Sequence, residues 1–418
     1  MRPCIGRLTV RVLFAAPAYK PAWRLGGPVL SVSSLAEALV RRGHEVTVFT
    51  SDSNLDQTLE VPTGRPVDVD GVQVWYFRRW QPLRRLFPSV SYVSKSIGFL
   101  YSPHMAEALD RTVPSVEVVH THLPFNYPTY AAARAAFAHR KPLFYHQRGV
   151  LDPDHLKFRA LKKMLYLRLV ERHLLRRATT LIALTEDEVL SYKRLEVDIP
   201  CRVIPNGIDA NAYAISRRPA ALDPLGIEPG RKVILFLGRI HPTKGADRLL
   251  EAFIRVHTAF HDAVLVLAGP DEFGLEASLR QRADALLRTR RVIFPGMVNG
   301  SLKSELLARA DLFCLPSSAE GFSLAVLEAM ASGTAVLLSP TCHFPEVERV
   351  GAGVVSDTSP SALASALERL LPDRDALARM GRAGAALVAE RYSVDRVADM
   401  TLEAYREGLE RFRAGHGG

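Results

Sequence analysis

The sequence predicts an α/β protein built of two doubly wound domains. The chain has 418 residues, which is too long for one compact core. Short apolar runs typical of strands alternate with helix-like stretches, and this alternation builds parallel sheets. The alternation breaks at residues 205–229, which contain four prolines and show no clear periodicity. We therefore expect domains over residues 1–205 and 206–390, followed by a helix over residues 391–418.

The first strand is expected at residues 10–16, and a turn with Gly26 and Gly27 separates it from a helix. That helix ends at Gly43, a residue type that favours helix ends. With the next strand at residues 45–50, this forms a βαβ unit. Further strands of the first domain are expected at residues 72–77, 116–120, 143–146, 180–184 and 201–204. Those of the second domain are expected at residues 233–237, 263–268, 291–294, 312–315 and 335–338.

The composition is that of an ordinary globular protein, with 48% hydrophobic and 23% charged residues. The four cysteines are scattered without a C-x-x-C pair, so neither a cysteine zinc site nor a disulfide framework is indicated. This suits a reducing compartment. No apolar run approaches the ~20 residues that span a bilayer, and the first residues carry no apolar signal-peptide core. We expect a cytoplasmic protein, soluble or peripheral on the inner face of the cytoplasmic membrane.

The net charge of +10 lies entirely in the first half of the chain. Residues 1–205 hold 29 Lys and Arg against 18 Asp and Glu, a balance of +11, and the remainder holds 25 against 26. This excess is either an ordinary solvated surface or the sign of an anionic partner that only the first half meets.

The strongest local signal is the turn at residues 316–323, which follows a predicted strand and precedes a helix. In an open α/β sheet, ligands bind at the carboxyl ends of strands, and a helix N-terminus there offers N–H groups to an anion. Glu320 lies on this turn, and Glu328 lies two turns into the helix. Carboxylates repel a diphosphate, so we expect them to bind sugar or ribose hydroxyls. The alternative is a capped core helix with two incidental acids.

A second turn, at residues 237–245, also lies between a strand and a helix. Its Arg239 and Lys244 could reach a pyrophosphate, the arginine through its planar fork and the lysine as a point charge. The alternative is an ordinary solvated basic turn. The run Gly26-Gly27-Pro28 lacks the G-x-G-x-x-G spacing, so a dinucleotide fingerprint is not supported. We expect this run to allow close backbone approach to a phosphate or sugar.

Two histidines end a strand of the first domain, in the run Val118-Val119-His120-Thr121-His122. We expect His120 and His122 to face opposite ways, so that one of them points into the cleft. A buried core histidine is the simpler explanation for either residue taken alone.

The pair Glu320 and Glu328 forms an E-x7-E element, and here the sequence resembles the family-four retaining glycosyltransferases, or glycosyl transferases group 1. The stretch EGFSLAVLEAMASGTAV is the most specific part of the resemblance. LGRIHPTKG, VIPNGID at residues 203–209, the early glycines and VHTH are similar to the family in the same order. The resemblance covers residues 10–405. It implies the GT-B fold, two Rossmann-like doubly wound domains facing across a cleft, with acceptor on the first and donor on the second.

The resemblance also implies roles in the second domain. Arg239 and Lys244 look like the pair that neutralises the donor pyrophosphate. Glu320 looks like the carboxylate that holds the hydroxyls of the transferred sugar, and Glu328 looks like the ribose ligand. Backbone contacts to sugar and phosphate are implied for Gly321, Phe322, Ser323 and Leu324.

In the first domain, Gly27 would approach the diphosphate, and His122 looks like the active-site histidine near the sugar, with His120 as its rival. The last helix would cross back to this domain. Two departures from the family stand out. Arg148 stands where the family often has histidine before glycine, which suggests an anionic acceptor group. Residues 341–346 replace a common Gly-Gly-x-Pro-Glu turn, which leaves the donor sugar open.

Together these features predict a glycosyltransferase of the hexosyltransferase type that uses a nucleotide-diphosphate sugar and retains the anomeric configuration. The expected acceptor is a glycan or lipid-linked molecule, such as a polyprenyl-diphosphate sugar or a lipopolysaccharide core, in cell-envelope polysaccharide biosynthesis. No metal, no other cofactor and no nucleic-acid partner are expected. The alternatives are a GT-B sugar-nucleotide epimerase or hydrolase, and a non-catalytic sugar-nucleotide-binding protein.

Two segments of the first half are both basic and apolar, which suits an anionic membrane surface. Residues 78–87 interleave Arg78, Arg79, Arg84 and Arg85 with Trp80, Leu83, Leu86 and Phe87. Residues 156–177 form a predicted basic helix with leucines at positions 161, 165 and 169. The alternative for this helix is that its leucine stripe packs on the sheet.

Overall fold

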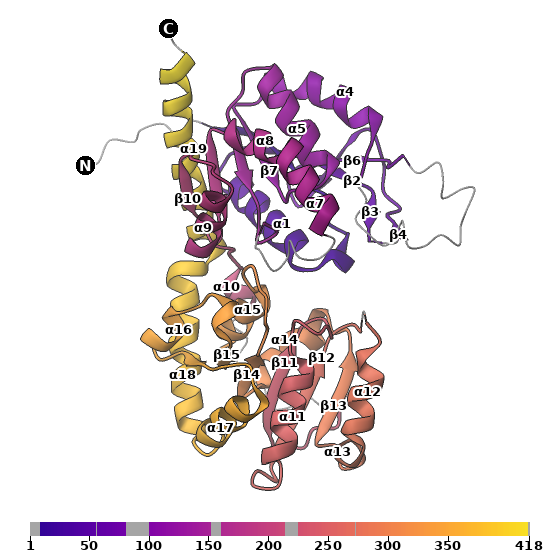
Figure 1. The fold of residues 1–418 in the computed structure, drawn as a ribbon, viewed down its shortest axis with the longest axis vertical. Helices are drawn as coiled ribbons and strands as arrows, with labels where there is room; N and C mark the ends of the chain where they lie inside the picture. Colours follow the sequence, from indigo (N-terminus) through magenta and orange to yellow (C-terminus); the bar gives the residue numbers. More distant parts are fainter. Residues whose placement is uncertain are drawn as a thin grey trace. The chain divides into compact units, whose positions relative to one another are not determined.

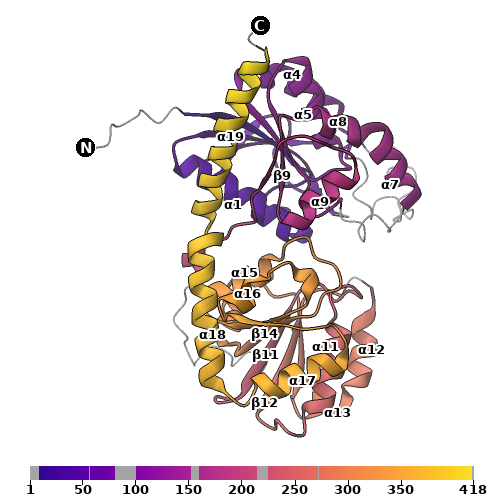
Figure 2. The ribbon, with the colours of Figure 1, turned by 60° about the vertical axis from the view of Figure 1, so that its left-hand side comes forward.

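The computed structural model describes residues 9–55, 57–80, 100–151, 160–213, 225–271 and 273–416. Internal contacts divide the chain into two compact units, one of Met1–Gly207 with Val394–Gly418 and one of Ile208–Ser393. These divisions lie within a few residues of the boundaries expected after residues 205 and 390. Each unit is an open sheet covered by helices on both faces (Figures 1 and 2).

The first unit contains an eight-stranded sheet in the order β10-β9-β8-β7-β1-β2-β6-β5. Neighbouring strands are parallel except for the antiparallel edge pair β5 and β6. The strands of this sheet are β1 (Arg11–Ala15), β2 (Glu45–Ser51), β5 (Pro66–Val69), β6 (Val72–Phe77), β7 (Val118–His122), β8 (Leu143–His146), β9 (Thr180–Ala183) and β10 (Cys201–Val203). Strands β3 (Ser53–Asn54) and β4 (Gln57–Thr58) form a separate antiparallel pair in this unit. Its helices are η1 (Trp23–Leu25), α1 (Gly27–Arg41), α4 (Pro103–Thr112), η2 (Val113–Ser115), α5 (Tyr127–Ala138), α7 (Ala160–Tyr166), η3 (Leu167–Glu171), α8 (Arg172–Arg176), α9 (Glu186–Arg194) and α19 (Val394–His416).

The second unit contains a fully parallel six-stranded sheet in the order β13-β12-β11-β14-β15-β16. Its strands are β11 (Lys232–Leu237), β12 (Ala263–Ala268), β13 (Val292–Gly296), β14 (Leu312–Leu315), β15 (Ala335–Leu338) and β16 (Gly353–Val355). Its helices are α10 (Ala210–Tyr213), α11 (Ala246–Val256), α12 (Leu275–Arg282), α13 (Asp284–Arg288), α14 (Gly300–Arg309), α15 (Leu324–Ala331), η5 (Pro340–Cys342), α16 (Glu346–Arg349), α17 (Pro360–Leu370), α18 (Arg374–Leu387) and η6 (Val388–Tyr392).

Strands β8, β12, β14 and β15 begin and end at the predicted residues. Strand β7 lies two residues later than predicted, because the backbone N–H of Val116 still bonds to the carbonyl of Val113 in the preceding turn η2. The shift brings both histidines into the strand. The prediction missed β5, a polar edge strand, and β16, which has only three residues.

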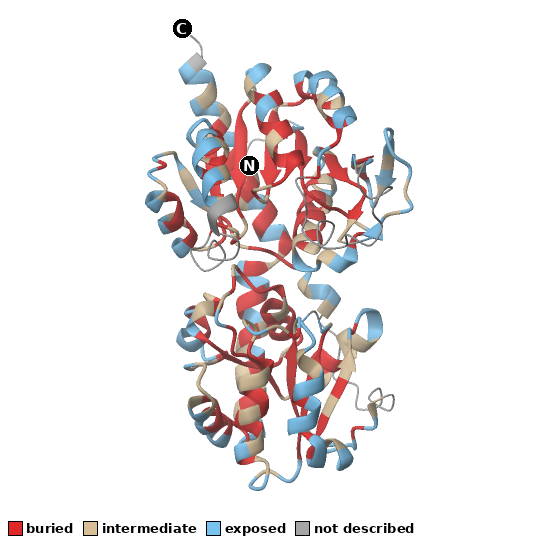
Figure 3. Cartoon of the chain, turned by 45° about the vertical axis from the view of Figure 1, so that its right-hand side comes forward, coloured by how far each residue is buried: buried red, intermediate tan, exposed pale blue. Residues whose placement is uncertain are grey.

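Buried strand residues of the first unit alternate between two cores, one on each face of the sheet, as strand geometry requires. On β1, Leu13 belongs to the core with α4 and α5, and the next residue, Phe14, belongs to the core with α1 and α19. Figure 3 shows that the buried residues lie along the strands and on the helix faces that cover them. The strands therefore read as nearly continuous apolar runs in the sequence.

Helix α19 lies along α1 and the sheet of the first unit (Figure 2). The guanidinium of Arg42, at the end of α1, bonds to the carboxylates of Asp395 and Asp399 on α19. Further along α19, the Tyr405 hydroxyl lies 2.6 Å from Nδ1 of His120 in the core. Thus the end of the chain supplies part of the first unit's interior.

The packing of α19 gives a prediction on two of its glycines. A Cβ atom at Gly408 would lie 2.4 Å from Cζ of the buried Phe144 ring, whereas one at Gly415 would meet nothing within 4 Å. Alanine improves helix propensity at both positions, so their difference isolates the packing effect. We expect Gly408→Ala to lower the free energy of unfolding by about 1–3 kcal/mol relative to Gly415→Ala, as overpacking does. Urea unfolding of both variants checks this, and equal stabilities would contradict the docking of α19.

Candidate functional site

The two turns singled out in the second unit meet at the carboxyl ends of the adjacent strands β11 and β14. The Thr243 carbonyl accepts hydrogen bonds from the Ser318 backbone N–H at 2.7 Å and from the Ser317 hydroxyl at 2.9 Å. Gly245 has φ = 78°, and a Cβ there would lie 2.2 Å from the Pro316 carbonyl oxygen. Only glycine fits this approach, so the basic and the acidic turn form one structure.

Joining the turns places Lys244 against Glu320. The lysine Nζ lies 2.5 Å from the Glu320 carboxylate, with the two side chains only 17% and 7% exposed. Arg239 lies on the same basic turn and is exposed. The site thus contains one nearly buried ion pair and a second cation at its edge.

Glu328 lies in α15 and is 2% exposed. Its carboxylate accepts a hydrogen bond from the Tyr213 hydroxyl at 2.8 Å and pairs with Lys303 Nζ at 2.6 Å. Burial and the nearby Glu328 carboxylate raise the pKa of Tyr213, so this hydroxyl stays protonated and donates. Sequence reasoning missed Tyr213 and Lys303, since neither lies in a motif and both reach Glu328 only through the fold.

The other predicted donor-site residues form the start of α15. Ser323 is the N-cap of this helix, but its side chain makes no capping hydrogen bond, and Gly321 is partly exposed beside it. The Phe322 ring packs against Phe344 at 4.5 Å and against Tyr392 at 5.6 Å between centroids. Leu324 is buried. In residues 321–324, the backbone groups rather than the side chains are therefore suited to bind a ligand.

The turn at residues 341–346, which departs from the family, still closes onto the acidic turn. The hydroxyls of Ser339 and Thr341 both donate to the Ser317 carbonyl at 2.5 Å. His343 has φ = 59°, a left-handed conformation that glycine adopts more easily. The turn is thus bonded to the acidic turn through Ser339 and Thr341, with a histidine at a left-handed position.

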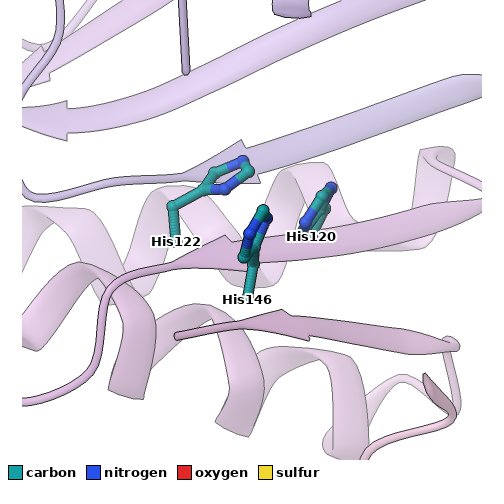
Figure 4. A group of neighbouring side chains, drawn as sticks. All are labelled: His120, His122 and His146. Carbon is teal, nitrogen blue, oxygen red and sulfur yellow. The ribbon is translucent and has the colours of Figure 1, made fainter. Parts of the chain in front are cut away.

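In the first unit, the expectation that His120 and His122 face opposite ways is wrong. Residues two apart in a strand point to the same face, and the two rings lie 4.1 Å apart between centroids. His146 of the neighbouring strand β8 joins them, at 5.8 Å from each ring (Figure 4). All three rings are buried, so neither His120 nor His122 is exposed.

These histidines are held neutral. Burial lowers the pKa of all three well below the ordinary value, and the nearby charge of Arg148 lowers it further. Among the described residues, Nε2 of His120, Nε2 of His122 and both nitrogens of His146 have no hydrogen-bond partner. The interior of the first unit thus holds an unusually polar and poorly satisfied cluster.

The three histidines are also a possible metal-ligand group, because one nitrogen of each lies within 4.8 Å of the others. However, Arg148 Nε donates to His122 Nδ1 at 3.2 Å. A guanidinium can only donate, so neutral His122 must carry its proton on Nε2 and has no free lone pair for a metal. Only the imidazoles of His120 and His146 could then bind a metal ion, and the positive charge of Arg148 would repel it. This cluster is therefore a poor metal site.

Arg148, which suggested an anionic acceptor group, is held by side chains of the first unit. Its Nη1 donates to the Ser31 hydroxyl at 2.9 Å and to the Asn206 side-chain oxygen at 2.8 Å. Burial lowers the pKa of Arg148 to about 10. The residue is partly exposed, with its charged group held deep in the first unit.

The predicted glycine-rich turn opens α1. Gly26 is the N-cap, with φ = 70°, and Gly27 is the exposed first residue of the helix. No side chain caps this N-terminus. The glycine that needs its conformational freedom is therefore Gly26, and Gly27 leaves the helix end accessible.

The two segments expected at a membrane, residues 78–87 and 156–177, differ in how far their described side chains are exposed. The prediction that Arg79 contacts a membrane is wrong, because its Nε bonds to Asp52 at 2.7 Å and the two side chains are only 6% and 4% exposed. Trp80 is 63% exposed. Arg78 is exposed. Residues 81–87, including Leu83, Arg84, Arg85, Leu86 and Phe87, lie outside the described residues.

In the basic helix, Leu165 and Leu169 are 59% and 67% exposed. The alternative that this stripe packs on the sheet is therefore wrong for these two residues. The start of the segment, residues 156–159, and the side chains at 161 and 162 lie outside the described part of the chain. No helix in the described ranges is long and apolar enough to cross a bilayer.

Two family models match the chain. The model described as Glycosyl transferases group 1 matches residues 218–386, and that described as Glycosyl transferase 4-like domain matches residues 26–207. Together they take in most of the chain, which belongs to the group 1 glycosyltransferases.

Individual relatives agree with this class. An uncharacterized glycosyltransferase of Methanocaldococcus jannaschii is 27% identical over 407 residues, which are 92% of this chain and 95% of that protein. The D-inositol 3-phosphate glycosyltransferase of Nocardia farcinica is 34% identical over 228 residues, 52% of this chain and 49% of that protein. The match thus spans about half the length of the latter enzyme.

Solved structures show the fold. HepE of Anabaena, in complex with UDP and glucose, has a TM-score of 0.71 at 20% identity and covers 95% of this chain and 100% of its own. Sucrose-phosphate synthase of Thermosynechococcus elongatus has a TM-score of 0.70 at 21% identity, with 96% and 100% coverage. The predicted GT-B fold of two Rossmann-like domains is confirmed.

The buried histidines predict acid sensitivity. A histidine whose folded pKa lies below the unfolded value of ~6.5 contributes stability above that pH, and the contribution is lost as the pH falls. Glu171 opposes this, since burial raises its pKa to about 7, so its contribution is present at low pH and lost as the pH rises. As the pH falls from 6.5 to 5 the three histidines outweigh this one carboxyl, and the loss of stability should steepen to about 2.7 kcal/mol per pH unit near pH 5.

Chemical unfolding at several pH values measures this slope. His146→Gln should make it shallower by about 1.4 kcal/mol per pH unit, because one titrating group is removed. His104→Gln, at an exposed position of α4, is the matched control and should leave the slope unchanged. An unchanged slope in His146→Gln would mean that this imidazole is protonated in the folded protein.

Proposed function

We propose that this glycosyltransferase moves a sugar from a nucleotide-diphosphate sugar to a glycan or lipid-linked acceptor, with retention of the anomeric configuration. The observation that carries the proposal is the nearly buried pair of Lys244 and Glu320 where the ends of β11 and β14 meet. This is where ligands bind in an open parallel sheet. The solved complex of HepE with UDP and glucose supports a nucleotide-sugar donor.

The proposed division of labour follows from charge. Arg239 and Lys244 would face the diphosphate together with the uncapped N-terminus of α15, where charge builds as the leaving group departs. Glu320 would hold sugar hydroxyls, and its bond to Lys244 would orient it. Glu328, fixed by its two partners, would hold the ribose hydroxyls.

From the first unit, we propose that the exposed Gly27 approaches the diphosphate, and that the buried His122 acts only through Arg148, which bonds to its Nδ1. Cationic side chains and helix ends would neutralise the diphosphate, so we propose that no metal ion takes part. An epimerase or hydrolase would use the same donor groups but would consume donor without an acceptor.

A matched pair of lysines tests the donor site. Lys244 lies at the carboxyl end of β11, and Lys232 at the opposite end pairs with Asp262 at 3.1 Å. We expect Lys244→Met to lower kcat by about 10²–10³-fold, the range for loss of one electrostatic donor, and Lys232→Met to leave it unchanged. Glu320→Gln should likewise abolish transfer in a folded protein.

The measurement is transfer from nucleotide sugars in EDTA and in magnesium, with circular dichroism to check folding. Equal loss in both lysine variants would refute the assigned site. Donor breakdown that is the same with and without acceptors would favour the hydrolase alternative, and activity restored only by magnesium would refute metal independence.

We further propose that the first unit binds an anionic membrane surface. The support is an exposed basic and apolar face of α7 and η3, made of Met164, Leu165, Arg168 and Leu169. Beside it, a groove between α5 and α8 contains further cationic and aromatic side chains, Tyr130, Arg134, Phe137, His173 and Arg177. Among the described residues, Arg134, His173 and Arg177 form no ion pair with an acid. Basic and apolar groups side by side suit lipid headgroups.

Co-sedimentation with anionic and neutral vesicles tests this. Arg134→Ser with Arg177→Ser should weaken binding to anionic vesicles by roughly thirtyfold, since each basic residue contributes about 1 kcal/mol near headgroups. Leu165→Ser with Leu169→Ser should also weaken it. Phe273→Ser with Met297→Ser, which changes two exposed apolar residues of the second unit, is the control. Equal binding of the wild type to both vesicle types would reject the proposal.

A further inference from the structure

Arg148 is a cation in the interior of the first unit without a carboxylate partner. Its three hydrogen bonds go to neutral acceptors, namely His122 Nδ1, the Ser31 hydroxyl and the Asn206 side-chain oxygen. Among the described residues, no acid forms an ion pair with it. The carboxylate that influences it most is that of Glu188, which instead accepts from the Leu184 backbone N–H.

Such an arrangement is costly, because a buried charge normally has a counter-charge. Two other buried cations have such a partner, since Arg79 pairs with Asp52 and Lys244 with Glu320. The buried Arg291 has backbone carbonyls as acceptors for its Nε and Nη2 groups instead. The groups that accept hydrogen bonds from Arg148 are all neutral, and the neighbouring histidines are kept uncharged by burial. The interior thus holds the guanidinium in place without neutralising it.

The backbone conformation of Arg148 also favours a ligand site. Arg148 has φ = 54°, and the following Gly149 has φ = 79°, so a bulky residue occupies the left-handed region. Such conformations cost about 1–3 kcal/mol and persist where surrounding contacts impose them, often at ligand sites. The three hydrogen bonds from the side chain supply these contacts.

The Arg148 guanidinium also has N–H donors beyond those used in these three hydrogen bonds. It has five N–H groups, and its three hydrogen bonds use Nε and Nη1 only. Nη2 makes no hydrogen bond to any described residue, and Arg148 is partly exposed, so this edge can be reached from outside. An anion there would gain a charge-assisted hydrogen bond and supply the missing counter-charge.

We propose that Arg148 is an anion-binding residue of the first unit, and that the acceptor carries a phosphate or carboxylate group that bonds to its Nη2 edge. His122 then acts behind it, as the neutral support that fixes the guanidinium through Nδ1. The acceptor part of this inference rests on the proposed function, because it places the acceptor on the first unit. The anion-binding part stands on the geometry of Arg148 alone.

Phosphate binding tests the site without any transfer reaction. Inorganic phosphate can also bind near Lys244, so the experiment uses Lys244→Gln as the background and follows thermal unfolding as phosphate is added. We expect phosphate to raise the melting temperature of Lys244→Gln, since a ligand of the folded state stabilises it. Adding Arg148→Gln should raise the Kd for phosphate at least tenfold. An unchanged Kd would overturn the proposal.

A second measurement covers the case in which Arg148→Gln fails to fold. The Nε resonance of Arg148 in the wild-type protein is assigned by its loss in Arg148→Lys, and phosphate is then titrated. A shift of this resonance that saturates with the thermal effect supports the site, and an unmoved resonance overturns it.

The acceptor class is tested separately by transfer to a sugar phosphate and to the same sugar without phosphate. Arg148→Lys, which keeps the charge but loses the planar fork, should raise KM at least tenfold for the phosphorylated acceptor and leave the neutral one unchanged. If phosphate binds at Arg148 but both acceptors respond equally, the anion site stands and the acceptor assignment fails. If neither acceptor is used by the wild type while phosphate binds, the proposed function is at fault instead.

Discussion

The contact between two turns of the second unit determines most of what the protein can do. Gly245 brings one turn so close to the Pro316 carbonyl that no side chain would fit, and the Thr243 carbonyl accepts three hydrogen bonds from Ser317 and Ser318 of the other turn. This contact holds Lys244 against Glu320. Without this contact between the turns, Lys244 and Glu320 would lie on two independent loops and would not be held together.

Arg148 differs from the buried charges that have a carboxylate or lysine partner, which occur in both units and include Arg79 with Asp52 in the first. In the second unit, Glu320 and Glu328 each have a lysine within hydrogen-bond distance, so the acids are neutralised before a ligand arrives. In the first unit, the buried cation Arg148 is surrounded by neutral imidazoles and amides. Since an unpaired charge costs more than a paired one, the first unit is the one that gains most from an anionic ligand.

The fold also shows which of the excess basic residues of the first half serve the structure and which lie at the surface. Some arginines serve the structure, as Arg42 does in docking α19 and Arg79 in pairing with Asp52. Others, such as Arg134 and Arg177, line an open groove beside exposed leucines. Net charge alone could not separate these groups, because it counts a buried ion pair and a free surface arginine alike.

The sequence alone determined the class of fold, most strands and the class of enzyme, because strand and helix periodicity and the E-x7-E run are local. It also named Lys244, Glu320 and Glu328, but not that Lys244 bonds to Glu320. The face shared by His120 and His122 followed from strand geometry, and the prediction misjudged it. Tertiary structure alone decided the partners Tyr213 and Lys303, the burial of Arg79, and the exposure of Leu165 and Leu169. Those properties depend on which distant segments pack together, and no local pattern of residues records that.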